Sequence, residues 1–365
     1  MKVKLGDLTK IRTGKLDANA SSPNGKYPFF TCSKEPLRIN SHSYDCECVL
    51  VAGNGDLNVK YYNGKFDAYQ RTYIIEDNGS NQLYMPYLYY FMEGYVEELR
   101  KLSIGGVIKY IKLGNLTEAL IELPKIEDQR AIVDILNKSK RILSYHQQQL
   151  QKLDELVKAR FVEMFGDPVT NPMDWPTKPL LEMGYCKNGM NFHTGDSGIE
   201  MHCLGVGDFK DYSVIDGTDY LPTISLNEAP PEESMLQDGD LVFVRSNGNK
   251  ALVGRCLLVY PHNTPTTYSG FCIRYRLTSA EVNIAYLLRV LKTDSMRKKM
   301  AGRGANIQNL NQQILAALNI PTPPLELQEW FTAFIEQVDK SKVAVQKSLD
   351  EAQLLFDSLM QHYFG

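Results

Sequence analysis

The same pattern occurs twice in this sequence, and the repeat constrains the fold more than any other feature. Residues 121–129 (IELPKIEDQ) and 320–328 (IPTPPLELQ) align at an offset of 199 residues. The same offset carries Gly105 onto Gly304 without a gap. A fixed offset over so long a stretch predicts two tandem units of one architecture.

The beginnings of the two units match at a smaller offset. Leu5 and Gly14 match Leu180 and Gly189 at an offset of 175. The second globular part is therefore longer by 24 residues, the difference between 199 and 175. We expect these additional residues to lie in loops, where chain length costs little and function varies.

Length and composition fit two ordinary domains. The 365 residues, 43% of them hydrophobic, are too many for one typical domain and can bury two cores. A net charge of -3 and a pI near 6.1 argue against a uniformly basic surface, so local charge must decide nucleic-acid binding. The seven cysteines form no Cys-x-x-Cys pair, and no signal peptide or membrane span is visible. We expect a soluble, reduced, cytoplasmic protein.

Two long segments, 127–165 and 325–364, lack Pro and Gly and are strongly helical in pattern. Apolar residues recur in both at heptad spacing, which is typical of coiled-coil seams. The first helix would span about 58 Å at roughly 1.5 Å per residue, too long for burial in one small domain. We expect the helices to pair with each other, antiparallel if the globular parts lie at opposite ends. The predicted seam residues are Ile132, Leu136, Leu143, Leu150, Leu153, Val157, Phe331, Ile335, Val338, Val345, Leu349, Phe356 and Leu359.

Polar residues interrupt both seams, at Ser139, His146 and Arg160 in the first and at Lys342 in the second. Such residues weaken a free helix but can fix register or partner. A structural spacer explains most of this pattern. Exposed faces such as 147–149 remain available for other subunits.

Each globular part has the pattern of a mixed α/β domain, with short strands, turn signals and then a helix. In the first part we predict strands at 48–52, 59–62 and 72–76, turns at 54–55, 63–64 and 78–79, and a helix at 86–101. In the second part we predict strands at 241–245, 254–259 and 271–277 and a helix at 284–300.

Polar loops 53–58 and 245–250 directly follow equivalent predicted strands. Their side chains could contact phosphates or base edges. Ordinary turn chemistry explains the Asn-Gly pairs taken alone. The candidate DNA contacts in this region are Asn54, Asn58, Lys60, Arg245, Ser246, Asn247, Asn249 and Lys250.

A glycine-rich loop follows a basic cluster at the end of each predicted globular helix, at 103–109 and 301–308. Glycines let backbone amides approach a phosphate, and flanking cations release counterions. A helix C-cap explains one glycine but not the same loop in both units. The candidates here are Lys101, Ser103, Gly105, Gly106, Lys109, Arg303, Gly304, Asn306 and Gln308. Lesser candidates are Gln70, Arg71 and Arg274, although strand alternation would bury some such residues.

The sequence lacks the motifs of common catalytic sites. The patterns GxxxxGK[ST], HExxH, GxSxG and a GxGxxG at a strand–helix junction are absent. Residues 171–175 (NPMDW) superficially resemble the Asn-Pro-Pro-aromatic loop of adenine methyltransferases, but the second Pro and the following aromatic are missing. His202-Cys203 has no further ligands at metal spacing. We expect no catalysis, metal or cofactor in this chain.

The segments 123–129 and 321–328, the helices that end in Phe-Gly, and Gly166-Asp167-Pro168 resemble the specificity subunit of type I restriction-modification systems. The resemblance covers essentially the whole chain, including the order of the repeats. It implies a non-catalytic DNA-recognition subunit with target-recognition domains at 1–122 and 167–320. Helical spacer regions would occupy 123–166 and 321–365.

By this resemblance, each domain reads one half of a split, asymmetric DNA site, and the antiparallel helices set the unread spacer. Two methyltransferase subunits would dock, bind S-adenosylmethionine and methylate adenine. Restriction subunits would add translocation and cleavage with ATP and Mg. Two readers on a stiff spacer should meet half-sites roughly 10 bp apart, about one helical turn.

Two other interpretations remain open at this point. One is the recognition end of a single-chain restriction-methyltransferase, against which the end of the chain after the second repeat argues. The other is a coiled-coil scaffold or interaction protein with no DNA role, which the near-neutral charge suits. Salt-dependent DNA retention would separate these classes, because binding to phosphates weakens steeply with salt.

Overall fold

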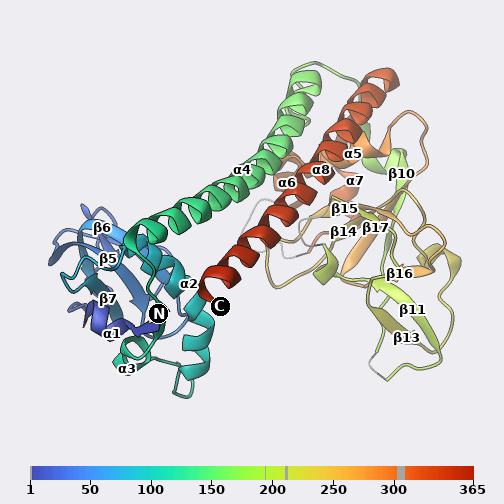
Figure 1. The fold of residues 1–365 in the computed structure, drawn as a ribbon. Helices are drawn as coiled ribbons and strands as arrows, with labels where there is room; N and C mark the ends of the chain where they lie inside the picture. The colour runs from blue at the N-terminus through green and yellow to red at the C-terminus, as the bar shows by residue number, and fades with distance from the viewer. Residues whose placement is uncertain (1, 194, 210–212, 302–308) are drawn as a thin grey trace. The chain divides into compact units, whose positions relative to one another are not determined.

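The computed structural model describes residues 2–193, 195–209, 213–301 and 309–365 (Figure 1). The chain divides into two compact units, one formed by 1–150 with 344–365 and the other by 151–343. Each unit contains a mixed α/β globular part and segments of both long helices. None of the helices in the described ranges combines the length and apolar character needed to cross a bilayer.

The globular part of the first unit is built on a six-stranded sheet of order β2-β7-β5-β6-β3-β4. All neighbours are antiparallel except β3 and β6. Helix α2 packs on β5 and β6, and its apolar face joins the main core of this unit. The strands are β1 (Lys2–Lys4), β2 (Thr9–Thr13), β3 (Tyr27–Phe30), β4 (Leu37–Ile39), β5 (Tyr44–Ala52), β6 (Val59–Ala68), β7 (Thr72–Asp77) and β8 (Leu120–Glu122), and the helices are α1 (Leu5–Leu8), α2 (Met85–Leu102) and α3 (Leu113–Thr117).

The second unit has a five-stranded sheet of order β10-β17-β14-β15-β12 and a three-stranded sheet of order β13-β11-β16. Helix α5 packs on β15. The strands are β9 (Thr177–Pro179), β10 (Gly184–Asn188), β11 (Ile199–Leu204), β12 (Val214–Asp216), β13 (Thr223–Leu226), β14 (Asp240–Val244), β15 (Cys256–Tyr260), β16 (Thr266–Tyr268), β17 (Cys272–Leu277) and β18 (Asn319–Pro321), and the helices are α5 (Ile284–Lys292), α6 (Asp294–Ala301) and α7 (Gln312–Ala316).

The sheet topology confirms the internal repeat. The strand order β2-β7-β5-β6 of the first unit recurs as β10-β17-β14-β15 in the second. The parallel pair β3–β6 recurs as the parallel pair β11–β16, and the antiparallel pair β3–β4 recurs as β11–β13. Residues 261–265 separate β15 from β16, whereas the corresponding β6 is one continuous strand.

A fully buried glutamine connects the start of each long helix to its globular part. In the first unit, Gln129 Oε1 accepts a hydrogen bond from the Tyr84 amide at 2.8 Å. Its Nε2 donates to the carbonyls of Gln82 at 2.8 Å and Pro124 at 2.9 Å. These bonds satisfy the side-chain amide without water, and they hold three separate backbone positions together.

The second unit repeats this arrangement bond for bond at the offset of 199. Gln328 Oε1 accepts from the Asn283 amide at 2.8 Å, and its Nε2 donates to the carbonyls of Glu281 at 3.2 Å and Pro323 at 2.8 Å. A buried tyrosine hydroxyl likewise donates to a strand carbonyl in both units. These bonds join Tyr87 to Glu122 at 3.0 Å and Tyr286 to Pro321 at 3.0 Å.

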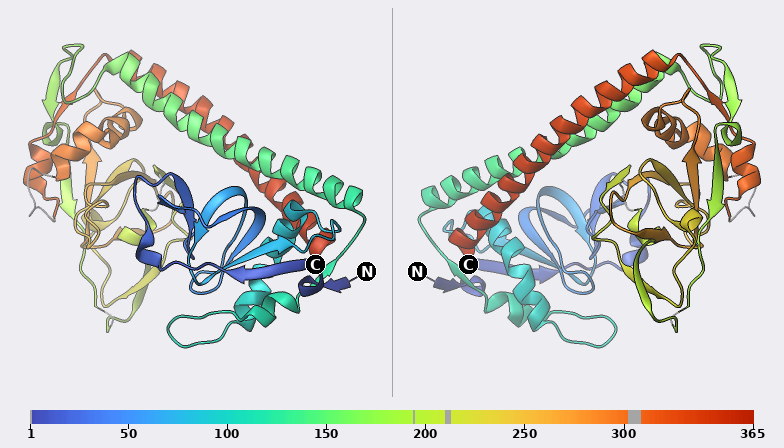
Figure 2. Two further views of the ribbon diagram at one scale, coloured as in Figure 1. Left: turned by 90° about the vertical axis from the view of Figure 1, so that its left-hand side faces the viewer. Right: turned by 90° about the vertical axis from the view of Figure 1, so that its right-hand side faces the viewer.

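The two long helices, α4 (Ile126–Phe165) and α8 (Leu325–Phe364), run antiparallel to each other, as predicted (Figure 2). In the first unit, Lys140 Nζ lies 5.7 Å from the centre of the Phe356 ring. In the second unit, Lys342 Nζ lies 2.6 Å from Asp154 Oδ1. The early part of α4 therefore meets the late part of α8, and the reverse holds in the other unit.

All predicted seam residues are buried or half-buried. Polar seam residues have local partners: Ser139 Oγ donates to the Ile135 carbonyl at 3.2 Å, and Lys342 bridges Asp154 and Asp339. The Lys342–Asp154 pair connects α4 to α8. It is the kind of contact by which a seam cation fixes register.

Three local predictions were wrong. The helix expected over 284–300 breaks at Thr293, whose hydroxyl donates to the Val290 carbonyl at 2.8 Å and accepts from the Met296 amide at 3.4 Å. The turn expected at Asn63-Gly64 lies within the continuous strand β6. The additional residues of the second unit do not lie only in loops, because they include strand β12, which has no counterpart in the first sheet.

Candidate nucleic-acid interface

Three segments of the first unit meet at one end of its sheet, where β5 ends and β6 turns into β7, and we call the surface at this end the edge of the unit. The Gly53 amide, directly after β5, donates to the Arg71 carbonyl at 2.8 Å in the turn between β6 and β7. The Ile111 amide donates to the Gly53 carbonyl at 2.9 Å, and the Gly55 amide donates to the Lys109 carbonyl at 3.0 Å. Backbone hydrogen bonds thus hold the two predicted DNA-contact loops, 53–58 and 103–109, beside the Gln70-Arg71 turn.

The second unit builds the same edge with the same backbone bonds. The Arg245 amide donates to the Phe271 carbonyl at 2.8 Å, and the Leu310 amide donates to the Arg245 carbonyl at 2.8 Å. Arg245 therefore occupies the place of Gly53, and Phe271 occupies the place of Arg71. The pairing of loops 53–58 and 245–250 from the sequence agrees with this geometry.

A glycine in each unit allows the chain after β2 or β10 to approach this edge. The Gly14 amide donates to the Thr72 carbonyl, and the Gly189 amide donates to the Cys272 carbonyl, both at 3.0 Å. A Cβ atom at Gly14 would lie 2.2 Å from the Ala68 oxygen, and one at Gly189 would lie 2.0 Å from the Ser269 oxygen. No larger residue fits at either place without moving the backbone.

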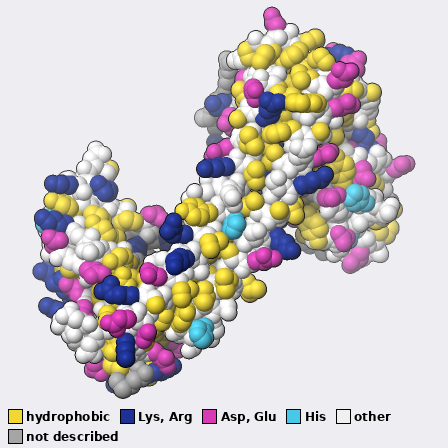
Figure 3. All heavy atoms as spheres, turned by 45° about the horizontal axis from the view of Figure 1, so that its top comes forward, with side chains coloured by type: hydrophobic (Ala, Val, Ile, Leu, Met, Phe, Trp, Pro, Cys, Tyr) yellow, Lys and Arg dark blue, Asp and Glu magenta, His cyan; other side chains and the backbone are white. Residues whose placement is uncertain are grey.

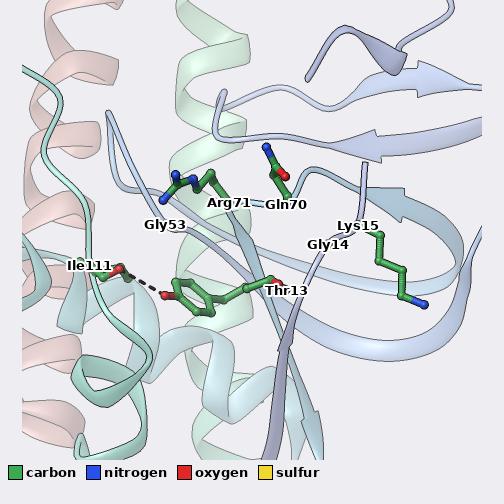
Figure 4. Close-up of a pocket in the computed structure, with 8 residues that line it drawn as sticks. Thr13, Gly14, Lys15, Gly53, Gln70, Arg71 and Ile111 are labelled. Atoms are coloured by element: carbon green, nitrogen blue, oxygen red, sulfur yellow. Dashed lines mark hydrogen bonds between the residues drawn. The ribbon is translucent and has the colours of Figure 1, made fainter. Parts of the chain in front are cut away.

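The side chains on the two edges differ although the backbone is shared. In the first unit, a polar depression of about 550 Å³ is lined by Lys15, Gln70 and Arg71 (Figure 4). Among the described residues, no carboxylate pairs with Lys15 or Arg71. At the corresponding place in the second unit, Phe271 is 61% exposed and Gly270 lies against Asn191. One edge presents free cations and an amide, and the other presents an aromatic ring beside the half-buried Arg245, whose guanidinium donates to the Gly270 carbonyl at 3.3 Å.

The predicted DNA-contact residues are distributed unevenly over these edges. Gln70, Arg71, Lys101, Gly105, Gly106, Lys109, Asn249 and Lys250 are exposed, and Asn54, Asn58, Lys60, Ser103, Arg245, Ser246 and Asn247 are half-buried. Arg303, Gly304, Asn306 and Gln308 lie outside the described residues. Lys15 and Phe271 were missed. Their positions beside Gly14 and at the strand turn are the signals that could have indicated them.

Several polar candidates are used within their own turns. Asn58 Nδ2 donates to the carbonyls of Cys32 and Asp56, both at 2.8 Å. Asn247 and Asn249 accept from backbone amides two residues further along the chain, at 2.8 and 3.0 Å. These bonds are the ordinary turn chemistry that the Asn-Gly pattern suggested. Burial lowers the pKa of Lys60, whose ammonium donates to Asn58.

The structure contradicts the surface position expected for Arg274. This residue lies in the middle of β17 and is completely buried, and its guanidinium nitrogens have no hydrogen-bond partner. Its carbon Cζ lies 5.0 Å from the centre of the Tyr185 ring. The neighbouring Arg276 forms a bidentate pair with buried Asp240, at 2.7 Å for each bond. Arg274 is therefore an interior residue, and the half-buried Arg276 is bound to an interior carboxylate.

The described residues offer no reactive cluster. No group of three or more His, Cys, Asp or Glu side chains there could hold a metal ion. All seven cysteines are free, and burial raises the pKa of Cys203 to about 12, so its thiol is protonated at neutral pH. On the face shown in Figure 3, Lys and Arg side chains are interspersed with Asp and Glu, in keeping with the small net charge.

The chain thus combines two equivalent α/β parts that carry unlike edges with a pair of antiparallel helices. The sequence model of the type I restriction modification DNA specificity domain matches residues 1–155 and 228–352. The match covers well over half of the sequence, and the chain belongs to this family. It is a DNA sequence-recognition subunit, because this family is the recognition component of such systems and not the catalytic one. The interpretation as a scaffold with no DNA role finds no support.

Individual relatives agree with this assignment. The chain is 27% identical to the EcoDI type I restriction enzyme specificity subunit of Escherichia coli, over 98% of this chain and 85% of that protein. It resembles the solved type I S subunit from M. genitalium with a TM-score of 0.59 and 16% identity, covering 100% of this chain and 96% of the other. A chain from a solved type I restriction-modification assembly gives a TM-score of 0.62 at 17% identity, covering 100% and 97%. These two structures show the shared fold.

Proposed function

We propose that this subunit reads a bipartite, asymmetric DNA site, with one half-site for each globular part. The observation that carries the proposal is the repeated backbone edge, on which Arg71 in one unit is replaced by Phe271 in the other. Equal frameworks present comparable surfaces to DNA, whereas unlike side chains select unlike bases. The target-recognition domains are then 1–122 and 167–320, with spacer regions at 123–166 and 321–365.

The exposed candidates that carry base or phosphate contacts in this proposal are Gln70, Arg71, Lys101, Lys109, Asn249 and Lys250. Amide and guanidinium groups suit base edges, and lysines suit phosphates. Lys15 joins this set because it lines the same depression as Gln70 and Arg71. Arg274 is removed from this set because it is completely buried.

The long helices serve as spacer and as docking surface for methyltransferase and restriction subunits. In the second unit, a groove of about 500 Å³ lies between α4 and α8 and is lined by Leu156, Arg160, Trp330 and Phe334. Trp330 is 63% exposed, and the Arg160 guanidinium lies 5.4 Å from the centre of its ring. Exposed Trp and Arg are the residues most enriched in protein–protein interfaces. S-adenosylmethionine, ATP and Mg then belong to the partner subunits.

Removal of one heptad from each helix tests the spacer role. Segments 144–150 and 346–352 face each other in the antiparallel pair, so their joint deletion shortens the spacer and keeps the seam in register. We expect methyladenine mapping to show the same two half-sequences at a changed separation. A constant separation would contradict the proposal. Methyladenine mapping with the full-length subunit and its methyltransferase partner gives the reference separation of the two half-sequences.

DNA retention at several salt concentrations tests the recognition role itself. The subunit with its methyltransferase partner should hold a duplex that carries the mapped site and release it steeply as salt rises, because bound cations displace counterions. Retention that is absent at low salt, or that does not change with salt, would contradict a phosphate-dependent DNA interface.

A further inference from the structure

The loop from Leu102 to Leu113 in the first unit exposes an unusual set of apolar side chains. Val107 has a relative exposure of 103%, and Ile108 is 63% exposed. Single exposed apolar residues are common on protein surfaces, but a concentration in one short loop indicates a binding surface. The other exposed apolar residues of this loop are Leu102, Ile104, Tyr110 and Leu113.

This loop has a defined backbone conformation. Ile104 and Tyr110 exchange two backbone hydrogen bonds of 3.0 and 2.9 Å, which close the loop into a narrow projection. Gly105 has a φ of 119°, and a Cβ atom there would lie 2.6 Å from the Ile108 oxygen. Val107 and Ile108 are β-branched and stiff about χ1, so they lose little side-chain freedom when they are buried.

Backbone contacts place this projection on the DNA-facing edge proposed above. The Lys109 carbonyl accepts from Gly55, and Tyr110 is bridged to Asn54. Both contacts are to the turn after β5, whose Gly53 also holds the Arg71 turn. The apolar tip and the cationic depression are therefore parts of one framework.

The charge around the tip favours nucleic acid as the occupant. Residues 100–117 contain four cations and no acidic residue, in a chain whose net charge is -3; Arg100 and Lys101 are paired with the nearby carboxylates of Asp56, Glu97 and Glu98. In the described part of the chain, no ion pair engages Lys109 or Lys112. An apolar tip that is directly followed by two free cations matches a duplex, in which phosphates flank an apolar base stack.

We propose that Val107 and Ile108 insert between base pairs of the half-site bound by the first unit, while Lys109 and Lys112 contact the flanking phosphates. Proteins that insert apolar side chains in this way unstack one base step and bend the duplex. The proposal rests on the DNA-recognition function and adds a mode of contact to it. Direct reading by Gln70 and Arg71 is a separate part of that function.

The test uses the full-length subunit with its methyltransferase partner and duplexes that carry the mapped site, with 2-aminopurine placed at successive positions of both half-sites. Binding of the unaltered protein should raise the fluorescence at one step in one half-site. The double variant Val107→Ala, Ile108→Ala should lose this rise and bind about tenfold more weakly. Val214→Ala, at an exposed position on β12, is the matched control and should change neither signal.

A double variant at Lys109 and Lys112, each changed to Ala, separates the two kinds of contact. It should keep the fluorescence rise at saturating protein and lower the slope of log affinity against log salt by about 2. No fluorescence rise at any position, with site-specific binding intact, would overturn the insertion and leave recognition standing. Loss of methyltransferase-subunit association in the Val107→Ala, Ile108→Ala variant, with unaltered 2-aminopurine fluorescence, would overturn it by showing a protein contact.

Discussion

At Gln129 and Gln328 the two units agree to the level of single hydrogen bonds, whereas at Arg71 and Phe271 equivalent backbone positions carry a cation and an aromatic ring. The first pair is fully buried, and the second pair is exposed. A framework position is fixed by buried polar groups that must find partners. An exposed edge position need not provide a protein partner for its polar groups, so its side chain is free to differ between the units. We propose that this difference carries the sequence selectivity.

The largest effect that sharpens this comparison is expected at the two arginines of β17. Arg276→Leu leaves the buried Asp240 carboxylate without its bidentate partner and should lower the free energy of unfolding by about 4 kcal/mol. Arg274→Leu removes a buried guanidinium that has no hydrogen-bond partner and should raise it by about 2 kcal/mol. Urea unfolding measures both. A loss of stability in Arg274→Leu would show that the contact of its guanidinium with the Tyr185 ring outweighs the cost of burying it without a hydrogen bond.

Replacement of a framework glutamine should have the next largest effect. Gln328→Ala removes three hydrogen bonds and leaves the half-buried Asn283 amide and two carbonyls without these partners, at a cost of about 3 kcal/mol. Gln129→Ala should cost a similar amount in the other unit. Gln149→Ala, at an exposed helix position, is the control and should cost less than about 0.5 kcal/mol. Unequal losses of unfolding free energy in the two variants would show that the two frameworks are not equivalent.

A change at the edge should affect DNA binding and leave stability alone. Arg71→Ala removes an exposed guanidinium without a described partner and should lower affinity for the target site about tenfold, with an unchanged melting temperature. Lys26→Ala, an exposed cation outside the depression, is the control. The affinity loss caused by Arg71→Ala should differ between a duplex altered in one half-site and a duplex altered in the other. Equal losses for these two duplexes would contradict a role of Arg71 in one half-site.

The smallest effect is expected at the helix seam. Lys342→Ala removes the pair with Asp154, and because Asp154 is largely exposed the cost should be about 0.5 kcal/mol. Lys347→Ala, which breaks an exposed pair within α8, should cost less still. Equal losses in the two variants would show that the contact between the helices adds nothing beyond an ordinary surface pair.

The sequence predicted the features that follow from periodicity. Both long helices and their seams were predicted, because heptad spacing and the absence of Pro and Gly leave few alternatives. The repeat was found for the same reason, since buried contacts such as those of Gln129 and Gln328 require the same residue in both units. The short pairs β1–β8 and β9–β18 were missed, because three-residue strands carry no detectable alternation.

The edges were harder to predict, because exposed residues leave no periodic signal. Arg274 was expected at the surface because it lies among Tyr and Arg residues, but both faces of β17 are covered, and its neighbour Tyr275 is equally buried. Lys15 and Phe271 were missed because their positions, beside Gly14 and in the turn before β17, become informative only once backbone contacts bring those segments to the edge. The break at Thr293 was missed although Thr-Asp-Ser is a helix-start signal, since the apolar pattern continues across it.

Methyladenine mapping of the Lys15→Ala, Arg71→Ala double variant tests the central claim most directly. Two equivalent frameworks with unlike edges predict relaxed selectivity at positions of one half-site, with the other half-site and the spacer unchanged. Relaxation spread over both half-sites, or an unaltered pattern in a variant that binds DNA normally, would contradict the assignment of one half-site to each edge.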